Sequence, residues 1–127
     1  MKKITVVVVD DSALVRSLLA EIVNRQSDMT CVGAASDPLV AREMIRNLNP
    51  DVITLDVEMP RMDGFEVATL VRHDERMKDL PIIMITSRTG EKHRQRAMAI
   101  GVNEYLGKPY QESLLLETIN RLVKVHD

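Results

Sequence analysis

The chain has 127 residues, of which 45% are apolar, and a formal net charge of −2, which suits one domain over residues 1–127 with a core of its own. Without a global positive charge, direct nucleic-acid binding is not expected, and no apolar run approaches the ~20 residues of a membrane span. Cys31 is the only cysteine, which excludes an internal disulfide and a multi-cysteine metal cage and predicts a cytoplasmic location.

Apolar runs alternate with longer amphipathic segments along the chain, a pattern typical of repeated strand-then-helix units. The four consecutive valines of Val6–Val9 predict a first strand that is buried on both faces. Further strands are predicted over residues 29–35, 51–56, 81–86 and 102–107, and helices over residues 12–25, 38–48, 65–71, 91–100 and 114–123. Right-handed crossovers would place these five helices on both faces of a parallel sheet.

Four of the five predicted helices carry an apolar stripe that we expect to face the sheet. The stripes are Leu14, Leu18, Leu19, Ile22 and Val23, then Val40, Met44, Ile45 and Leu48, then Phe65, Val67, Leu70 and Val71, and finally Leu114, Leu115, Ile119, Leu122 and Val123. Asp11 or Ser12 can cap the first helix, and Pro38 suits the first turn of the second.

Polar residues follow the predicted strands at their carboxyl ends. Asp10 and Asp11 come after the first strand, Asp56 after the third, Thr86 ends the fourth, and Lys108 lies just beyond the fifth. The carboxyl ends of parallel strands share one edge, so three carboxylates gathered there would repel one another unless a positive group balanced them. The candidate ligands are hard oxygens, which favour Mg²⁺ over zinc.

Asp56 is the candidate for phosphorylation. It follows the apolar stretch Val52–Leu55 and precedes a loop with Pro60 and Gly64 that would expose it. A carboxylate can accept a phosphoryl group to form an aspartyl-phosphate, with catalysis by positioning and charge neutralisation rather than by acid–base chemistry. Lys108 adds a point charge for a phosphoryl oxygen.

These motifs, in this order, resemble the receiver domain of two-component response regulators. The resemblance rests on the DDS sequence at residues 10–12, the strand ending at Asp56 and followed by MPRMDG, Thr86, and the pair Lys108–Pro109, and it covers essentially the whole chain. It implies a flavodoxin-like three-layer α/β/α fold with a five-stranded parallel sheet in the order 2-1-3-4-5. It also implies a phosphoacceptor signalling domain rather than an enzyme, which contributes to its own phosphorylation and dephosphorylation.

The resemblance assigns the acceptor and the metal ligands. Asp56 would take phosphate from a phosphohistidine on a sensor histidine kinase or its phosphotransfer domain. Asp10, Asp11 and Asp56 would bind Mg²⁺, and Glu58 would add its backbone carbonyl. No other cofactor is implied. A downstream effector protein or domain would read the phosphorylated state.

The resemblance also assigns a switch. Thr86 would hydrogen-bond the phosphoryl group and move towards it, which would draw Tyr105 from an outward to an inward rotamer. Lys108 would pair with a phosphoryl oxygen, and its bond to Pro109 is commonly cis in the family. The surface formed by the fourth helix, the fifth strand and the fifth helix would then change.

The two halves of the chain resemble different branches of this family. Residues 1 to about 64 are similar to the receiver of the chemotaxis methylesterase. From about Phe65 onward, the sequence looks like the terminal receiver of hybrid kinases in the chemosensory systems of twitching pili. The MPRMDG stretch at residues 59–64 would be the seam of a recombinant or engineered chimera.

Two residues beside the predicted site suggest control of the phosphate lifetime. Glu58 lies two positions after Asp56, and Arg88 lies two positions after Thr86. In the resembling family these positions flank the path of the hydrolytic water. We hypothesise that Glu58 and Arg88 pair across the site and shield the phosphoryl group.

Other functions remain open on the same fold. Flavin or nucleotide binding would need a Ser/Thr/Gly-rich phosphate loop after the first strand, where this chain has DDSALVR. A haloacid-dehalogenase-type phosphatase would need D-x-D there, whereas Asp10 and Asp11 are adjacent. A degenerate or engineered receiver-fold scaffold without regulated phosphorylation is the third alternative, and it would not respond to a beryllofluoride phosphoryl mimic with magnesium.

Overall fold

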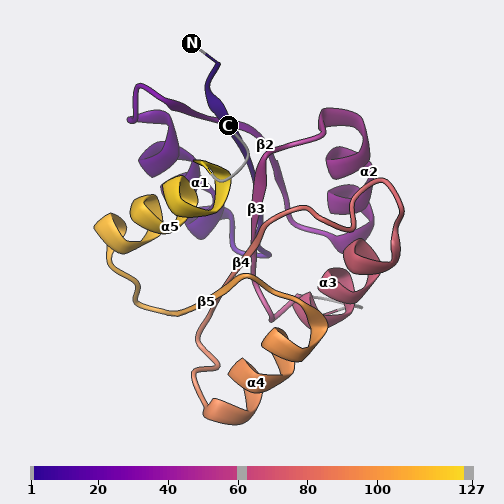
Figure 1. The fold of residues 1–127 in the computed structure, drawn as a ribbon. Coiled ribbons are helices and arrows are strands. Elements are labelled where there is room, and N and C mark those ends of the chain that lie inside the picture. Colours follow the sequence, from indigo (N-terminus) through magenta and orange to yellow (C-terminus); the bar gives the residue numbers. More distant parts are fainter. Residues whose placement is uncertain (1, 60–62, 125–127) are drawn as a thin grey trace.

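The computed structural model describes residues 2–59 and 63–124 and shows a five-stranded parallel sheet between two layers of helices (Figure 1). The strand order is β2-β1-β3-β4-β5, which confirms the predicted three-layer fold. Part of the predicted seam, residues 60–62, lies outside the described residues. None of the helices described is long and apolar enough to cross a membrane.

The elements alternate between strand and helix as the sequence predicts. In chain order they are β1 (Ile4–Val9), α1 (Ala13–Asn24), β2 (Met29–Ala35), α2 (Pro38–Leu48), β3 (Val52–Leu55), α3 (Gly64–His73), β4 (Ile82–Thr86), α4 (Glu91–Ile100), β5 (Glu104–Gly107) and α5 (Glu112–Lys124). Several caps follow from local sequence: the Ser12 side chain accepts a hydrogen bond from the Val15 N–H, and Asp63 and Glu66 form a capping box at the start of α3.

The register of the central strands brings the polar residues to one edge. Val9 of β1 pairs with Leu55 of β3, so Asp10 and Asp56 leave the sheet beside each other, and the Asp56 N–H donates to the Val9 carbonyl at 2.9 Å. Thr86 pairs with Gly107 in β5. The next residue, Lys108, donates its N–H to the Thr86 carbonyl at 2.8 Å.

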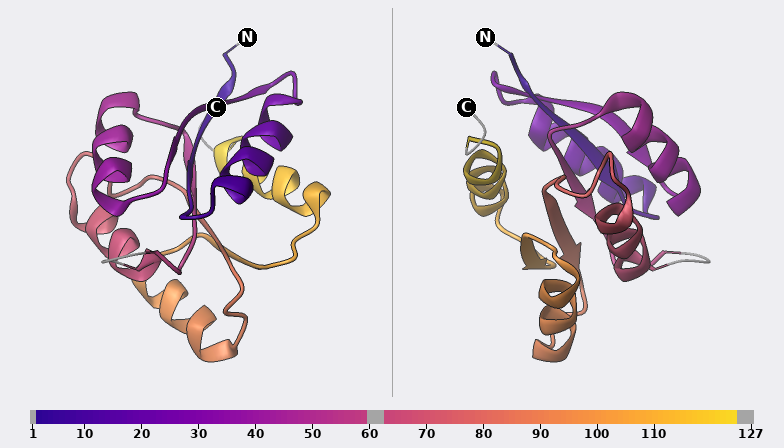
Figure 2. Two further views of the ribbon diagram at one scale, coloured as in Figure 1. Left: turned by 180° about the vertical axis from the view of Figure 1, so that it is seen from behind. Right: turned by 45° about the vertical axis from the view of Figure 1, so that its right-hand side comes forward.

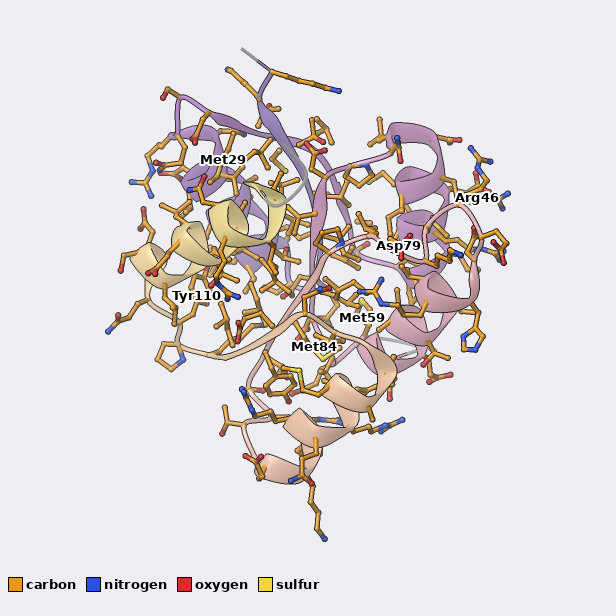
Figure 3. All side chains as sticks on the ribbon, in the orientation of Figure 1. Met29, Arg46, Met59, Asp79, Met84 and Tyr110 are labelled. Carbon is orange, nitrogen blue, oxygen red and sulfur yellow. The ribbon has the colours of Figure 1, made fainter. Side chains whose placement is uncertain are left out.

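Helices lie on both faces of the sheet (Figure 2), and two apolar clusters hold them there. One face of the sheet packs against α2, α3 and α4, and the other against α1 and α5. Figure 3 shows the buried side chains of Met29 and Met84 inside these layers, in keeping with core roles for methionine. Because both faces of the sheet are covered, alternate valines of β1 point into different clusters.

The helices bury narrower stripes than the sequence predicts. The predicted face residues Leu14, Leu18, Val40, Leu48, Leu70 and Leu114 are exposed. A helix resting on a sheet buries only one arc of its circumference, which in α1 contains Leu19, Ile22 and Val23. Residues at the edge of the apolar pattern, such as Leu14 with 69% exposure, fall outside that arc.

The start of α3 packs directly behind Asp56. The Gly64 N–H donates to the Val57 carbonyl at 2.8 Å. A Cβ atom on Gly64 would lie 2.2 Å from the Asp56 carbonyl oxygen, so no other residue fits without displacing that strand end. The glycine therefore lets α3 begin immediately against the backbone of the predicted acceptor.

Arg72 joins three segments at the other edge of the sheet. Its Nε donates to the Gly101 carbonyl at 3.0 Å, and its Nη1 donates to the carbonyls of Lys78 at 3.0 Å and Leu80 at 2.7 Å. Its Nη2 donates to Asn103 Oδ1 at 2.9 Å. The end of α3, the loop before β4 and the turn before β5 are thus held by one guanidinium.

We expect Arg72→Ala to lower the free energy of unfolding by about 2–3 kcal/mol, because it leaves several carbonyls without their charged donor. Arg76→Ala is the matched control, since Arg76 is exposed and its loss should cost less than about 0.5 kcal/mol. Urea unfolding of both variants measures the difference. Equal effects of the two substitutions would show that the hydrogen bonds of Arg72 do not contribute to the free energy of unfolding.

Candidate functional site

Three carboxylates meet at the carboxyl edge of the sheet. Each of Asp10, Asp11 and Asp56 offers an oxygen within 4.8 Å of the others. Asp10 and Asp56 are buried, with 1% and 4% exposure, whereas Asp11 faces solvent. The structure therefore brings together the acids that the sequence places at the ends of β1 and β3.

Lys108 is the cation that balances these acids. Its Nζ lies 3.2 Å from Asp10 Oδ2 and 3.6 Å from Asp56 Oδ1. The peptide bond between Lys108 and Pro109 is cis. A single ammonium faces three carboxylates, so the site keeps an excess of negative charge.

Burial and the neighbouring charges together perturb the titration of Asp56. Its pKa is raised from 3.8 to about 6, first by burial and then by the charge of Asp10, with a smaller contribution from Asp11. Lys108 and a hydrogen bond from the backbone of Glu58 oppose the rise. The charged form of Asp56 is thus disfavoured by its burial and by the neighbouring acids.

The backbone around β1 holds Asp10 in place. Asp10 Oδ1 accepts a hydrogen bond from the Ser12 N–H at 2.9 Å, which orients the carboxylate at the start of α1. Arg16 Nη1 donates to the Asp10 carbonyl at 2.8 Å. The sequence analysis did not predict this role of Arg16. The available signal was an arginine one turn into the helix that follows the two acids.

Thr86 ends β4, and the loop after it contacts Glu58. Thr86 is fully buried, and its Oγ1 accepts from the Arg88 N–H at 3.1 Å. Glu58 Oε1 accepts from Ser87 Oγ at 2.7 Å and lies 3.9 Å from Arg88 Nε. Glu58 and Arg88, the pair named from sequence, are therefore in reach of each other, and Ser87 is an additional contact that sequence analysis missed.

Tyr105 in β5 connects to this same loop. Its side chain is 7% exposed and its hydroxyl donates to the Arg88 carbonyl. Burial raises the pKa of this hydroxyl, so it remains a donor at neutral pH. The resemblance implies that Tyr105 moves from an outward to an inward rotamer on phosphorylation, and this movement stays a prediction.

A divalent cation fits the three acids. All their donors are oxygens, and two of the residues are buried. Burial and then the charge of Asp10 raise the pKa of Asp56, and a bound cation would oppose that rise. The backbone of Glu58 lies against Asp56, which keeps its carbonyl a candidate fourth ligand. Binding of the cation and the role of that carbonyl stay predictions.

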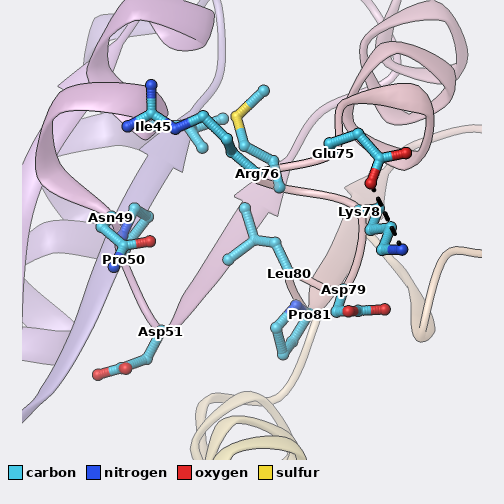
Figure 4. A pocket seen from close by; sticks show the side chains of 11 residues that line it. Ile45, Asn49, Pro50, Asp51, Glu75, Arg76, Lys78, Asp79, Leu80 and Pro81 are labelled. Atoms are coloured by element: carbon cyan, nitrogen blue, oxygen red, sulfur yellow. Dashed lines mark ion pairs between the residues drawn. The ribbon is translucent and has the colours of Figure 1, made fainter.

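A cleft elsewhere on the molecule does not contain these residues. It has a volume of about 270 Å³ and lies at the amino ends of β3 and β4, between the segments 49–51 and 75–81 (Figure 4). Leu80 points into it, and Lys78 and Glu75 pair at its rim at 3.7 Å. It opens at the sheet edge opposite to Asp56.

We expect Asp56→Asn to stabilise the metal-free protein by about 1–3 kcal/mol near pH 8. The folded-state pKa of about 6 lies above the ordinary 3.8, so the ionised carboxylate costs stability above about pH 6. That cost shrinks as the pH falls towards about 4, and the gain from asparagine should shrink with it.

Urea unfolding with a chelator present, at about pH 8 and about pH 4.5, measures this gain. Asp28→Asn, which removes an exposed carboxylate, is the control and should change little at either pH. A gain that is equal at both pH values, or a loss at pH 8, would contradict the raised pKa of Asp56.

Comparisons with known proteins agree with this geometry. A family model described as the response regulator receiver domain matches residues 6–120. The protein-glutamate methylesterase/protein-glutamine glutaminase 1 of Albidiferax ferrireducens is 56% identical over 111 residues, which cover 86% of this chain and 29% of that protein. Its counterpart in Nitrosomonas europaea is 50% identical over 111 residues, covering 86% of this chain and 30% of that protein.

Solved structures show the same fold. The response regulator domain of Thermotoga maritima CheB has a TM-score of 0.87 at 35% identity and covers 97% of this chain and 98% of its own. The chemotaxis protein CheY4 of Vibrio cholerae has a TM-score of 0.86 at 32% identity, with 94% and 98% covered.

The chain spans only about 30% of the length of the curated relatives it matches. The 111-residue alignments extend across both halves of the chain, so they do not separate the origins of the halves, and the chimera stays a prediction. The family model covers nearly all of the chain, and the acids and the lysine of the family motifs lie together at one edge of the sheet. The chain therefore belongs to the response regulator receiver domains, with receivers of chemotaxis regulators among its relatives.

Proposed function

We propose that Asp56 accepts a phosphoryl group from a phosphohistidine on a partner kinase or its phosphotransfer domain. An Asp56 carboxylate oxygen attacks phosphorus and the phosphorus–nitrogen bond breaks. The electron pair returns to the phosphorylated ring nitrogen, and because the other ring nitrogen carries a proton, the imidazole leaves as neutral histidine. The product is an acyl phosphate on Asp56. The observation that carries this proposal is the buried Asp56 beside two acids and the Lys108 ammonium.

The other residues act by position and charge. Lys108, already 3.6 Å from Asp56 Oδ1, would pair with a phosphoryl oxygen. The Thr86 hydroxyl, which here accepts a hydrogen bond from the Arg88 N–H, would donate one to another phosphoryl oxygen. Asp10, Asp11 and Asp56 would hold Mg²⁺ with the Glu58 carbonyl, and the bound ion would neutralise the charge that gathers during transfer.

Phosphorylation would then shift the equilibrium between two states of the surface formed by α4, β5 and α5. A Thr86 hydroxyl that turns to the phosphoryl group releases the Arg88 N–H, and the Arg88 carbonyl is the acceptor of Tyr105. A change at Thr86 therefore reaches β5 and α4 through one loop. The domain would serve a kinase and a downstream effector in the cytoplasm as a phosphoacceptor, without chemistry on other substrates.

Incubation with acetyl phosphate and Mg²⁺, followed by intact-mass measurement, tests the proposal. We expect one added phosphoryl group that survives acid and is removed by hydroxylamine, as an acyl phosphate is. Asp56→Asn should abolish the adduct, and a chelator should suppress it in the native chain.

Asp51→Asn is a matched control, because Asp51 is a carboxylate at the opposite end of β3 and should leave the adduct intact. Phosphorylation that persists in Asp56→Asn would move the acceptor elsewhere. No adduct in the native chain, together with no response to beryllofluoride and Mg²⁺, would favour the scaffold alternative.

Arg88→Ala should accelerate loss of the phosphate by about three- to fivefold, because an exposed ion pair worth under about 1 kcal/mol no longer shields the phosphoryl group. Glu58 and Arg88 lie at the site entrance, with their side chains about half exposed at 49% and 45%. The decay of the phosphorylated mass after removal of acetyl phosphate gives the rate.

Glu58→Gln should have a similar effect, because it removes the same charge pair from the other side. Arg42→Ala, an exposed arginine on α2, is the control and should leave the decay unchanged. An unchanged decay in Arg88→Ala would dispose of the shielding role.

A further inference from the structure

A set of hydrogen bonds closes the turn between β1 and α1. Asp10 Oδ1 accepts from the Ser12 N–H at 2.9 Å, and Ser12 Oγ accepts from the Val15 N–H at 3.2 Å. The Ser12 carbonyl accepts from the Arg16 N–H at 3.0 Å, and the Asp10 carbonyl accepts from Arg16 Nη1 at 2.8 Å. The turn therefore begins on the backbone of Asp10 and ends on the side chain of Arg16.

Asp11 lies inside this turn without a bond of its own side chain. That side chain is exposed and makes no hydrogen bond or ion pair with any residue in the described ranges. An exposed side chain without a partner changes rotamer freely. An Asp11 oxygen nevertheless lies within 4.8 Å of oxygens of Asp10 and Asp56. The direction of the Asp11 backbone is therefore what brings this carboxylate to the site.

Arg16 is the side chain that fixes that backbone. Side chains on a helix lean towards its N-terminus, so an arginine one turn into α1, which begins at Ala13, reaches back over the turn before it. Asp10 is 1% exposed, so its carbonyl has little access to water and needs a donor from the protein. Arg16 is half-buried and pairs with no carboxylate in the described part of the chain, whereas Lys108 contacts Asp10 Oδ2 at 3.2 Å. The arginine thus holds the backbone, and the lysine holds the acid.

We propose that Arg16 is a positioning residue for the divalent cation. Its bond to the Asp10 carbonyl fixes the peptide between Asp10 and Asp11 and so aims the Asp11 carboxylate at the site. This inference rests on the proposed function, because it concerns the Mg²⁺ that Asp10, Asp11 and Asp56 would hold. Mg²⁺ needs near-ideal octahedral geometry, so a ligand that is free to turn away lowers the affinity.

Positioning and charge predict opposite effects of removing Arg16. A guanidinium bonded to Asp10 repels a second cation at the same acids, so the loss of its charge alone would tighten Mg²⁺ binding. The loss of positioning would weaken Mg²⁺ binding instead. A contribution to stability alone would leave the affinity of the folded protein unchanged. The direction of the change in affinity therefore identifies the role of Arg16.

Mg²⁺ titrations of the metal-free chain, followed by the backbone amide signals in NMR spectra, test the proposal. We expect Arg16→Met to bind Mg²⁺ about five- to tenfold more weakly than the native chain. Arg16→Lys should bind about two- to threefold more weakly, because the ammonium keeps the charge and can donate a single bond to the carbonyl. Arg42→Met removes an exposed arginine on α2 and is the matched control, with an expected change of less than about twofold.

A second measurement needs no metal. With a chelator present, the Ser12 N–H that bonds to Asp10 should exchange with solvent deuterium at least about tenfold faster in Arg16→Met than in the native chain. The rate is compared with that of the Val8 amide in β1, whose exchange reports opening of the whole sheet. Faster exchange at Ser12 relative to Val8 separates a loosened turn from a general loss of stability.

Unchanged or tighter Mg²⁺ binding in Arg16→Met overturns the positioning role, and so does equal weakening in Arg42→Met. If Arg16→Met does not fold, Arg16→Lys decides, and binding as tight as in the native chain overturns the role. Acetyl phosphate separates this inference from the proposed function. Arg16-dependent Mg²⁺ binding without any phosphorylation overturns the proposed function and leaves the role of Arg16 standing, whereas phosphorylation with an Mg²⁺ affinity independent of Arg16 does the reverse.

Discussion

The balance of charge at the carboxyl edge of the sheet is the constraint on which this domain depends. Asp10 and Asp56 are buried there with Asp11 beside them, and one ammonium from Lys108 contacts both buried acids at 3.2 and 3.6 Å. Removing carboxylates from water is costly unless charge is supplied, and one cation for three anions leaves a deficit. Burial and then the charge of Asp10 raise the pKa of Asp56, and a cation or a change of covalent state at Asp56 would alter that pKa.

The same edge connects the site to the surface of the protein. Thr86, the Arg88 backbone and Tyr105 form a short chain of hydrogen bonds from beside Asp56 to β5. A second set of contacts runs through the start of α3. Gly64 lies against the Asp56 backbone, and the next residue, Phe65, contacts Arg96 and His93 of α4. Helix α4, which buries only Ala97, is thus in contact with both sets, whereas the helices that bury three or more residues are held by the core.

Sequence reasoning identified most elements and the main site residues, since strand and helix periods are local and the polar residues at strand ends share one edge in any parallel sheet. It assigned too wide an apolar face to the helices, and Leu14 and Leu18 proved exposed because periodicity does not give the rotation of a helix on its sheet. It missed Arg16 and Ser87, whose bonds to Asp10 and Glu58 follow from loop geometry, and Arg72, whose carbonyl partners are spread over three segments.

The sequence by itself determined the order of strands and helices along the chain, the acids that follow β1 and β3, and the family motifs, because these are properties of neighbouring residues. Only the tertiary structure decided that Lys108 reaches Asp10, 98 positions away along the chain, and that burial makes Asp56 hard to ionise. Desolvation and long-range pairing depend on which strands lie side by side and on what covers them. Likewise, only the packed core shows that α4 buries a single residue, Ala97.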